Sequence, residues 1–223
     1  MNYPEKLTKE DIAYRASIEL PENSYVNLGI GLPSLCAKYL EPKKNIIFQA
    51  ENGILGFNEL SKENEQNENL IDAGGQFLNY VPGISYFDSA DSFAMIRGGH
   101  IDVTVLGGLQ VSENGDLANW MIKSRGIGSI GGAMDLVTGA REVIVTMEHI
   151  TKDNKFKILK NCDFPLTGVN CVNKIITDIA VIEVREEGMF IVELAKDWSL
   201  EQVQSLTEPK LIPSKIIKDY VTR

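Results

Sequence analysis

Glu51 is the residue whose position most favours chemistry. It follows the mostly apolar run 45–50, which predicts a buried strand, and it precedes Asn52 and Gly53, which favour a tight turn. A carboxylate held where burial ends, in a partly dry cleft, can act as a general base or as a nucleophile. From position alone, a solvated carboxylate at a strand end is the commoner interpretation.

Two glycine-rich segments could place backbone N–H groups around a ligand. The run 126–132 can form an anion-binding nest that stabilises an oxyanion or binds a phosphate, although a plain surface loop fits it equally well. Residues 29–31 resemble part of a dinucleotide fingerprint, but Ser34 stands where the third glycine is needed, so nicotinamide binding is disfavoured. The two histidines, His100 and His149, exclude a multi-histidine metal site, and we expect no bound metal.

The elements that must position these residues alternate along the chain. We expect strands at 25–28, 45–50, 101–106 and 142–147, and a hairpin from 179–184 and 189–194. Helices are predicted from Thr8 to about Leu20, from Pro33, and after Ser199. Segment 57–72 is polar and acidic, and we expect a mobile surface flap outside the core. The pattern predicts one α/β domain over 1–223, an open, mainly parallel sheet with helices on both faces.

The composition of the chain limits the kinds of partner that we expect it to bind. The net charge of −9 disfavours nucleic-acid binding as the main activity. No stretch approaches the ~20 apolar residues that cross a bilayer, so we expect no membrane partner. Three irregularly spaced cysteines give no disulfide framework, which favours a reducing cytoplasm. Ligands of such sheets bind beyond the carboxyl ends of the strands, where the glycine-rich segments and Glu51 fall.

Five motifs in register over about residues 12–206 give the chain a resemblance to a known family. The motifs are Val-Asn-Leu-Gly-Ile-Gly-Leu-Pro at 26–33, Glu-Asn-Gly-Ile-Leu-Gly at 51–56, Arg-Gly-Gly-His-Ile-Asp-Val-Thr-Val-Leu-Gly at 97–107, Leu-Ala-Asn-Trp at 117–120 and Gly-Gly-Ala-Met-Asp-Leu-Val at 131–137. With these motifs the chain resembles the beta, glutamate-bearing subunits of the family I CoA transferases, including the acetoacetate:butyrate or acetate and the 3-oxoacid CoA-transferases.

The resemblance implies roles for individual residues. The family's nucleophilic glutamate maps onto Glu51, and the Gly-Gly-Ala-Met-Asp loop implies that Gly132 donates a backbone N–H to the reacting carbonyl. Family contacts to coenzyme A map onto Asn27, Gly107, Asn119 and Gly131.

The chain departs from the family pattern at two places. Ala50 replaces the serine that usually precedes the glutamate. Gly75 stands where many members carry a lysine that approaches the phosphates of coenzyme A. Phosphate binding must then rely on another group, such as Lys123 or a residue of a partner chain.

The implied reaction transfers CoA from a short-chain acyl-CoA to a carboxylic acid of the acetate, butyrate or acetoacetate class. It runs by ping-pong chemistry through a glutamyl-CoA thioester on Glu51, with no cofactor beyond coenzyme A as substrate. The implied partner is a CoA-transferase alpha subunit, in a heterotetramer. An acyl-CoA hydrolase, a glutaconate-type transferase and a non-catalytic sugar-phosphate-binding module are the alternatives on this scaffold. The sequence does not name the acyl chain or the acceptor acid.

Overall fold

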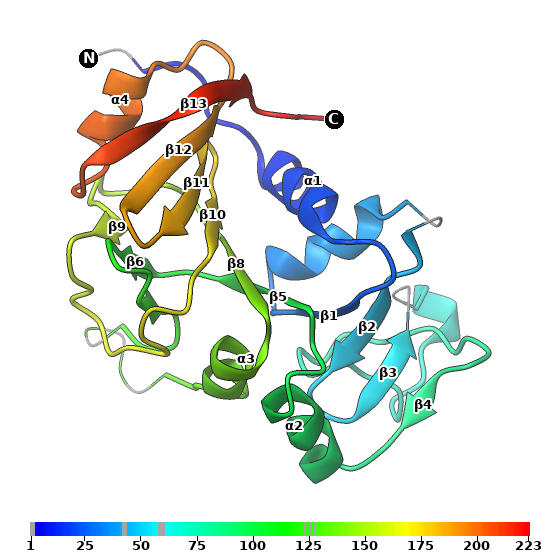
Figure 1. Ribbon diagram of the computed structural model, residues 1–223. Coiled ribbons are helices and arrows are strands. Elements are labelled where there is room, and N and C mark those ends of the chain that lie inside the picture. The colour runs from blue at the N-terminus through cyan, green and yellow to red at the C-terminus, as the bar shows by residue number, and fades with distance from the viewer. Residues whose placement is uncertain (1–2, 42–43, 58–60, 123, 125, 127) are drawn as a thin grey trace.

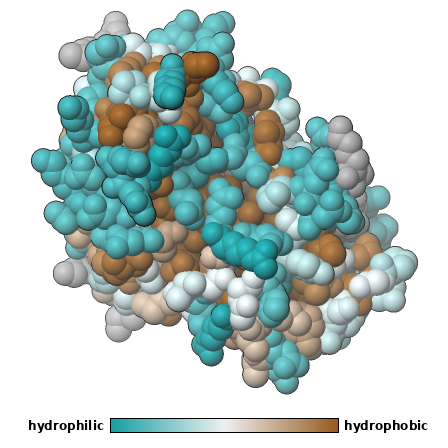
Figure 2. All heavy atoms as spheres, viewed as in Figure 1, coloured by the Kyte–Doolittle hydropathy of each residue, from teal (hydrophilic) through white to brown (hydrophobic). Residues whose placement is uncertain are grey.

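A computed structural model describes residues 3–41, 44–57, 61–122, 124, 126 and 128–223 (Figure 1). Lys123, which the sequence offers for phosphate binding, and Ile127 of the glycine-rich segment lie outside these residues. None of the helices in the described part of the chain has the length and apolar character of a membrane span. The face seen in Figure 2 is largely hydrophilic, with apolar residues in scattered groups.

Within the described residues, one ten-stranded sheet runs through the molecule. Its strands are β1 (Tyr25–Leu28), β2 (Ile47–Ala50), β3 (Ile54–Phe57), β4 (Ser85–Tyr86), β5 (Val103–Gly107), β8 (Glu142–Thr146), β10 (Lys174–Ile176), β11 (Ala180–Arg185), β12 (Gly188–Leu194) and β13 (Leu211–Asp219). Their order in space is β13-β12-β11-β10-β8-β5-β1-β2-β3-β4.

The centre of this sheet is parallel and its flanks are mixed. Strands β10, β8, β5, β1 and β2 pair in parallel, as expected from their apolar runs. β3 and β4 add antiparallel strands at one edge, and the predicted hairpin is present as the antiparallel pair β11 and β12. The prediction of an open, mainly parallel sheet is therefore confirmed.

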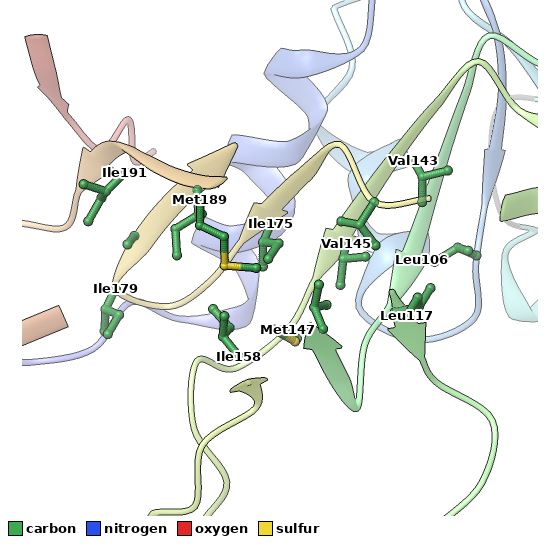
Figure 3. Packing of buried hydrophobic residues seen from close by; sticks show 14 of the residues in the cluster. Leu106, Leu117, Val143, Val145, Met147, Ile158, Ile175, Ile179, Met189 and Ile191 are labelled. Atoms are coloured by element: carbon green, nitrogen blue, oxygen red, sulfur yellow. The ribbon is translucent and has the colours of Figure 1, made fainter. Parts of the chain in front are cut away.

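Helices cover both faces of the sheet, as predicted. α1 (Lys9–Glu19) and the 3₁₀ helix η1 (Pro33–Tyr39) pack on one face, and α2 (Ser89–Arg97) and α3 (Ala133–Gly139) on the other (Figure 1). The alternation of strand side chains separates two cores, because Val143 and Val145 join the α2–α3 side whereas Ile144 joins the α1 side. Figure 3 shows the first of these cores.

Predicted helix starts are confirmed in detail. Thr8 and Asp11 form a capping box at the start of α1, and Ser199 and Gln202 form another at the start of α4 (Leu200–Ser205). A second sheet of three short strands lies outside the expected pattern, with order β7-β6-β9: β6 (Gln110–Ser112), β7 (Leu117–Ala118) and β9 (Ile158–Leu159).

The segment predicted to be a flap is only partly separate from the core. Residues 58–60 lie outside the described residues, and a single turn of 3₁₀ helix, η3 (Glu63–Glu65), follows them. Leu70 is buried, however, and packs with Ala50, Ile54 and Leu78 in a small apolar cluster. The expectation that the whole segment lies outside the core is therefore wrong, because one apolar side chain near its end anchors it.

The N-terminal segment is held by residues far along the chain. The Leu7 N–H donates to the Asp178 carbonyl at 2.9 Å, and the Trp198 indole N–H donates to the Glu5 carbonyl at 3.0 Å. In α1, the buried Arg15 guanidinium donates to both carboxylate oxygens of Glu193 in β12, at 2.7 and 2.6 Å. This two-point geometry compensates the desolvation of both charges and fixes α1 on the sheet.

Candidate active site

Glu51 lies in the tight turn that joins β2 to β3, where the sheet changes from parallel to antiparallel pairing. The Gly53 N–H donates to the Ala50 carbonyl at 3.0 Å and closes this turn, as the sequence predicts. Gly53 has φ of +113°, and a Cβ there would lie 2.0 Å from the Phe87 carbonyl oxygen. Only glycine satisfies both requirements, so this residue fixes the turn that presents Glu51.

A cleft of about 680 Å³ opens at the carboxyl ends of the central strands. Five of the six residues predicted for the site line it: Glu51, Gly107, Asn119, Gly131 and Gly132. Loops 29–32 and 72–76 form part of its wall, and Ile30 in the first of them is largely exposed. The topology thus brings together segments that are distant in sequence, as expected for an open α/β sheet.

Asn27 is the exception, because it lies beneath the cleft rather than on its wall. Its side chain is fully buried, and Nδ2 donates to Glu51 Oε2 at 3.3 Å and to Gln49 Oε1 at 2.7 Å. The structure therefore gives Asn27 a contact with the candidate nucleophile. A contact between Asn27 and coenzyme A stays a prediction.

Gly132 packs directly against Glu51. A Cβ at this position would lie 3.3 Å from Glu51 Cγ and 3.0 Å from Phe93 Cζ of α2. Its φ of −87° is open to any residue, so the close approach of Glu51 and Phe93, and not the backbone conformation, favours glycine here. No acceptor among the described residues takes the Gly132 N–H, which leaves it available for the predicted oxyanion contact.

The side chain of Asn119 is held in place through its amide carbonyl oxygen. The Thr167 hydroxyl donates to Asn119 Oδ1 at 2.6 Å, and the Asn119 N–H donates to that hydroxyl at 3.2 Å. The side-chain amide nitrogen makes no hydrogen bond among the described residues, so it is a donor that Asn119 can offer to a ligand in the cleft.

Sequence reasoning missed three lysines in the cleft wall, Lys9, Lys152 and Lys157. The last two lie in a polar run after β8 whose composition is typical of ordinary surface. Lys157 is half-buried, and within the described part of the chain no carboxylate forms an ion pair with it. Burial lowers the pKa of Lys157 to about 8, although Glu148 and Asp178 oppose the shift.

A carboxylate on a glycine-dependent turn, beside a closely packed glycine and in a cleft large enough for an extended ligand, is an arrangement that group transfer through a covalent intermediate can use. A protein-family model described as coenzyme A transferase matches residues 9–204. The chain belongs to the coenzyme A transferase family, as its motifs predict.

Several similar proteins are bacterial and are named as one subunit of an enzyme. The chain is 53% identical to the second subunit of a succinyl-CoA:3-ketoacid coenzyme A transferase of Helicobacter pylori over 200 residues, which cover 90% of this chain and 96% of that one. It is 45% identical to the second subunit of a 3-oxoadipate CoA-transferase of Pseudomonas putida over 213 residues, covering 95% and 100%.

Solved structures share the fold at low sequence identity. An acyl-CoA transferase, YdiF, of Escherichia coli O157:H7 superposes with a TM-score of 0.75 at 18% identity, over 98% of this chain and 44% of that one. Glutaconate coenzyme A-transferase of Acidaminococcus fermentans gives a TM-score of 0.70 at 16% identity, over 100% and 92%. The decarboxylase AibA/AibB gives 0.66 at 14% identity, over 97% and 90%, so the fold alone does not decide the reaction.

Gly132→Ala tests the close packing at Glu51. The added Cβ would lie 3.0 Å from Phe93 Cζ and 3.3 Å from Glu51 Cγ, so one of these side chains must shift slightly. Because the reacting atoms must align closely, we expect kcat for CoA transfer to fall by about tenfold, with little change in thermal unfolding. Gly131→Ala is the matched variant, since Gly131 has φ of +52° and no atom near its Cβ position. Gly131→Ala should lower the midpoint of thermal unfolding and should reduce kcat much less than Gly132→Ala does. Equal kcat values for the two variants would contradict the packing role.

Proposed function

We propose that this chain is the nucleophile-bearing subunit of a CoA transferase of the 3-oxoacid class, with Glu51 as the residue that forms a covalent intermediate. The observation that carries the proposal is the placement of Glu51 in the cleft on a glycine-dependent turn, with Gly132 packed on its Cγ. A sugar-phosphate-binding module would have no use for this arrangement.

The proposed chemistry proceeds through two exchanges at one carboxylate. Glu51 attacks the acyl-CoA carbonyl and displaces the CoA thiolate, giving a mixed acyl-glutamyl anhydride. The thiolate then attacks the glutamyl carbonyl and releases the acyl group as a free carboxylate. The resulting glutamyl-CoA thioester reacts with a second carboxylic acid by the same steps in reverse. Thioester energy is conserved throughout, so the steps need no cofactor beyond coenzyme A.

Negative charge develops on a carbonyl oxygen in each exchange. We propose that the Gly132 backbone N–H stabilises this charge, and losing one such donor typically costs ~2.7–4 kcal/mol. An acyl-CoA hydrolase would share the first exchange but would release the thioester to water. Loss of thioester that needs no carboxylic acid acceptor would therefore favour the hydrolase.

The names of similar proteins narrow the proposed substrates. The Helicobacter pylori and Pseudomonas putida relatives are named for a 3-ketoacid with succinyl-CoA and for 3-oxoadipate. Of the acids expected from sequence, acetoacetate is a 3-oxoacid, whereas acetate and butyrate receive no support from these relatives. We propose a 3-oxoacid as the acceptor.

We further propose that the single domain over 1–223 works with an alpha subunit, as a heterotetramer. Both bacterial relatives are named as one subunit of an enzyme that has more than one. The cleft of the single chain is open, and Ile30 on its wall is 71% exposed, which leaves apolar surface that a second chain could bury. A partner chain that covers the cleft would bury Ile30 and exclude water from the anhydride.

The partner requirement predicts that the purified chain alone has no transferase activity. Activity should appear when the chain is co-expressed with the alpha subunit of a 3-oxoacid CoA-transferase, and both chains should co-elute in size-exclusion chromatography. Full activity of the single chain, with no second chain in the mass spectrum, would refute the requirement.

The role of Glu51 predicts a trapped intermediate. With acyl-CoA and no acceptor, the complex should carry CoA on the peptide that contains Glu51, and borohydride should release the CoA and reduce the side chain to an alcohol. Glu51→Gln should abolish transfer, because the amide lacks the anionic nucleophile. Glu51→Asp, which withdraws the carboxylate by one methylene, should lose about 100-fold. Label on another carboxylate, or normal exchange by Glu51→Gln, would show that the nucleophile lies elsewhere.

Lys157 is a candidate for the cation that Gly75 does not supply. It is half-buried in the cleft wall without a carboxylate partner among the described residues, and a bound anion would compensate its desolvation. Both the phosphates of coenzyme A and a substrate carboxylate have the required charge. Position 75 itself is a turn residue, with φ of +77°, which suits glycine better than lysine.

The pKa of Lys157, near 8, makes this role dependent on pH. The cation is present below pH 8 and is lost as the pH rises through 8, so KM for acyl-CoA should increase between about pH 7 and pH 9. Lys157→Arg should remove this dependence because guanidinium stays charged, and Lys157→Ala should raise KM about tenfold near neutral pH. Lys155→Ala is the control, since Lys155 is exposed and paired with Asp153 at 2.8 Å. An unchanged KM in Lys157→Ala would exclude the contact.

A further inference from the structure

A row of buried polar side chains lies beneath Glu51 and leads away from the cleft. Asn27 in β1 donates through Nδ2 to Gln49 Oε1 in β2 at 2.7 Å, and Gln49 Nε2 donates to Ser92 Oγ in α2 at 2.7 Å. Asn27 and Ser92 are fully buried, and Gln49 is 1% exposed. Buried side chains in such a series constrain one another, because each has few alternative partners.

The direction of every hydrogen bond in the row follows from the carboxylate at its end. Ionised Glu51 accepts hydrogen bonds only, so Asn27 must turn its Nδ2 toward it. The same nitrogen faces Gln49, so Gln49 must offer its oxygen and turn Nε2 to the other side. Ser92 receives that nitrogen and must therefore provide an acceptor.

Among the described residues, the side-chain carbonyl of Asn27 makes no hydrogen bond that would fix the orientation of its amide group. Asn27 Oδ1 is buried without a hydrogen-bond partner among the described residues, and both Gln49 oxygens, Oε1 and the backbone carbonyl, accept from Nδ2. If the amide of Gln49 turned over, its nitrogen would face Asn27 and would favour Oδ1 there in place of Nδ2. Asn27 Oδ1 would then face Glu51 Oε2, and Oε2 would lose the hydrogen-bond donor that holds it.

We propose that Ser92 and Gln49 are positioning residues for the transfer reaction. They hold the Asn27 amide nitrogen on Glu51 Oε2 and so keep the carboxylate in the geometry for attack on the thioester. This inference rests on the proposed function, because it assigns a partner to the same nucleophile. Ser92 is not among the residues that line the cleft and acts only through the row.

The test is a double-mutant cycle on the assembled complex, with single-turnover formation of the glutamyl-CoA thioester as the rate measured. Ser92→Ala removes the acceptor and should lower this rate roughly tenfold or more, with little change in KM for acyl-CoA. Asn27→Ala should lower it at least as much. In the Asn27→Ala background Ser92→Ala should have no further effect, because the residue through which it acts is gone. Gln49→Met, which breaks the next link, should reproduce both results.

Thr104→Val is the matched control. Thr104 pairs with Asn27 on the neighbouring strand β5, it is fully buried, and its hydroxyl has no partner in the described part of the chain. Removing that hydroxyl leaves the row intact, so the rate should stay near wild type.

Additive losses from Ser92→Ala and Asn27→Ala would overturn the inference, as would a Thr104→Val loss equal to that of Ser92→Ala, because each would indicate a general packing effect. If Ser92→Ala does not fold, the Gln49→Met and Asn27→Ala pair decides the question by the same criterion. An active Glu51→Gln variant would instead defeat the proposed function itself, so the two failures are distinguishable.

Discussion

The contact between Gly53 and Phe87 is the constraint on which the site depends. The Phe87 N–H donates to the Gly53 carbonyl at 3.0 Å, and the glycine lies so close to Phe87 that no side chain fits between them. This contact joins the turn that carries Glu51 to the start of α2, whose N-cap is Asp88. The contact therefore fixes the turn that presents Glu51 relative to α2, which carries Ser92 of the buried polar row and Phe93 beside Gly132.

Much of the fold could be predicted from the sequence because the central strands are continuous apolar runs between helices with ordinary caps. The missed elements include α2, α3 and β10, and also the nine-residue β13, whose apolar residues are interrupted by the run 213–215. Other missed strands have a short or interrupted signal. β3 carries Gly56 within four residues, and β6, β7 and β9 contain two or three residues each, too few to show a period. Leu70 gives no signal in its acidic segment because one buried side chain makes no pattern, although it fixes the segment to the core.

The candidate site was predictable where a residue type carries the chemistry itself, as at Glu51 and Gly132. It was not predictable where a role comes from contacts across strands. Gln49 lies between the buried residues Phe48 and Ala50, and a polar residue inside an apolar strand was the available signal. Ser92 had none, because a serine in a helix is ordinary until the structure places it against Gln49. The family motif predicted that Asn27 belongs to the site, and the structure shows that its side chain contacts Glu51 and Gln49.

The anchoring of the N-terminal segment has a consequence for synthesis on the ribosome. Translation delivers α1 among the first elements, yet Glu193, which holds its Arg15, is made some 178 residues later. Trp198, which holds the backbone at Glu5, follows that. The apolar face of α1 finds its partners earlier, because η1 and the strands β1, β2, β5 and β8 that share its core all precede Glu193 in the chain. The ion pair that fixes the position of α1 is therefore among the last contacts of this core to form during synthesis.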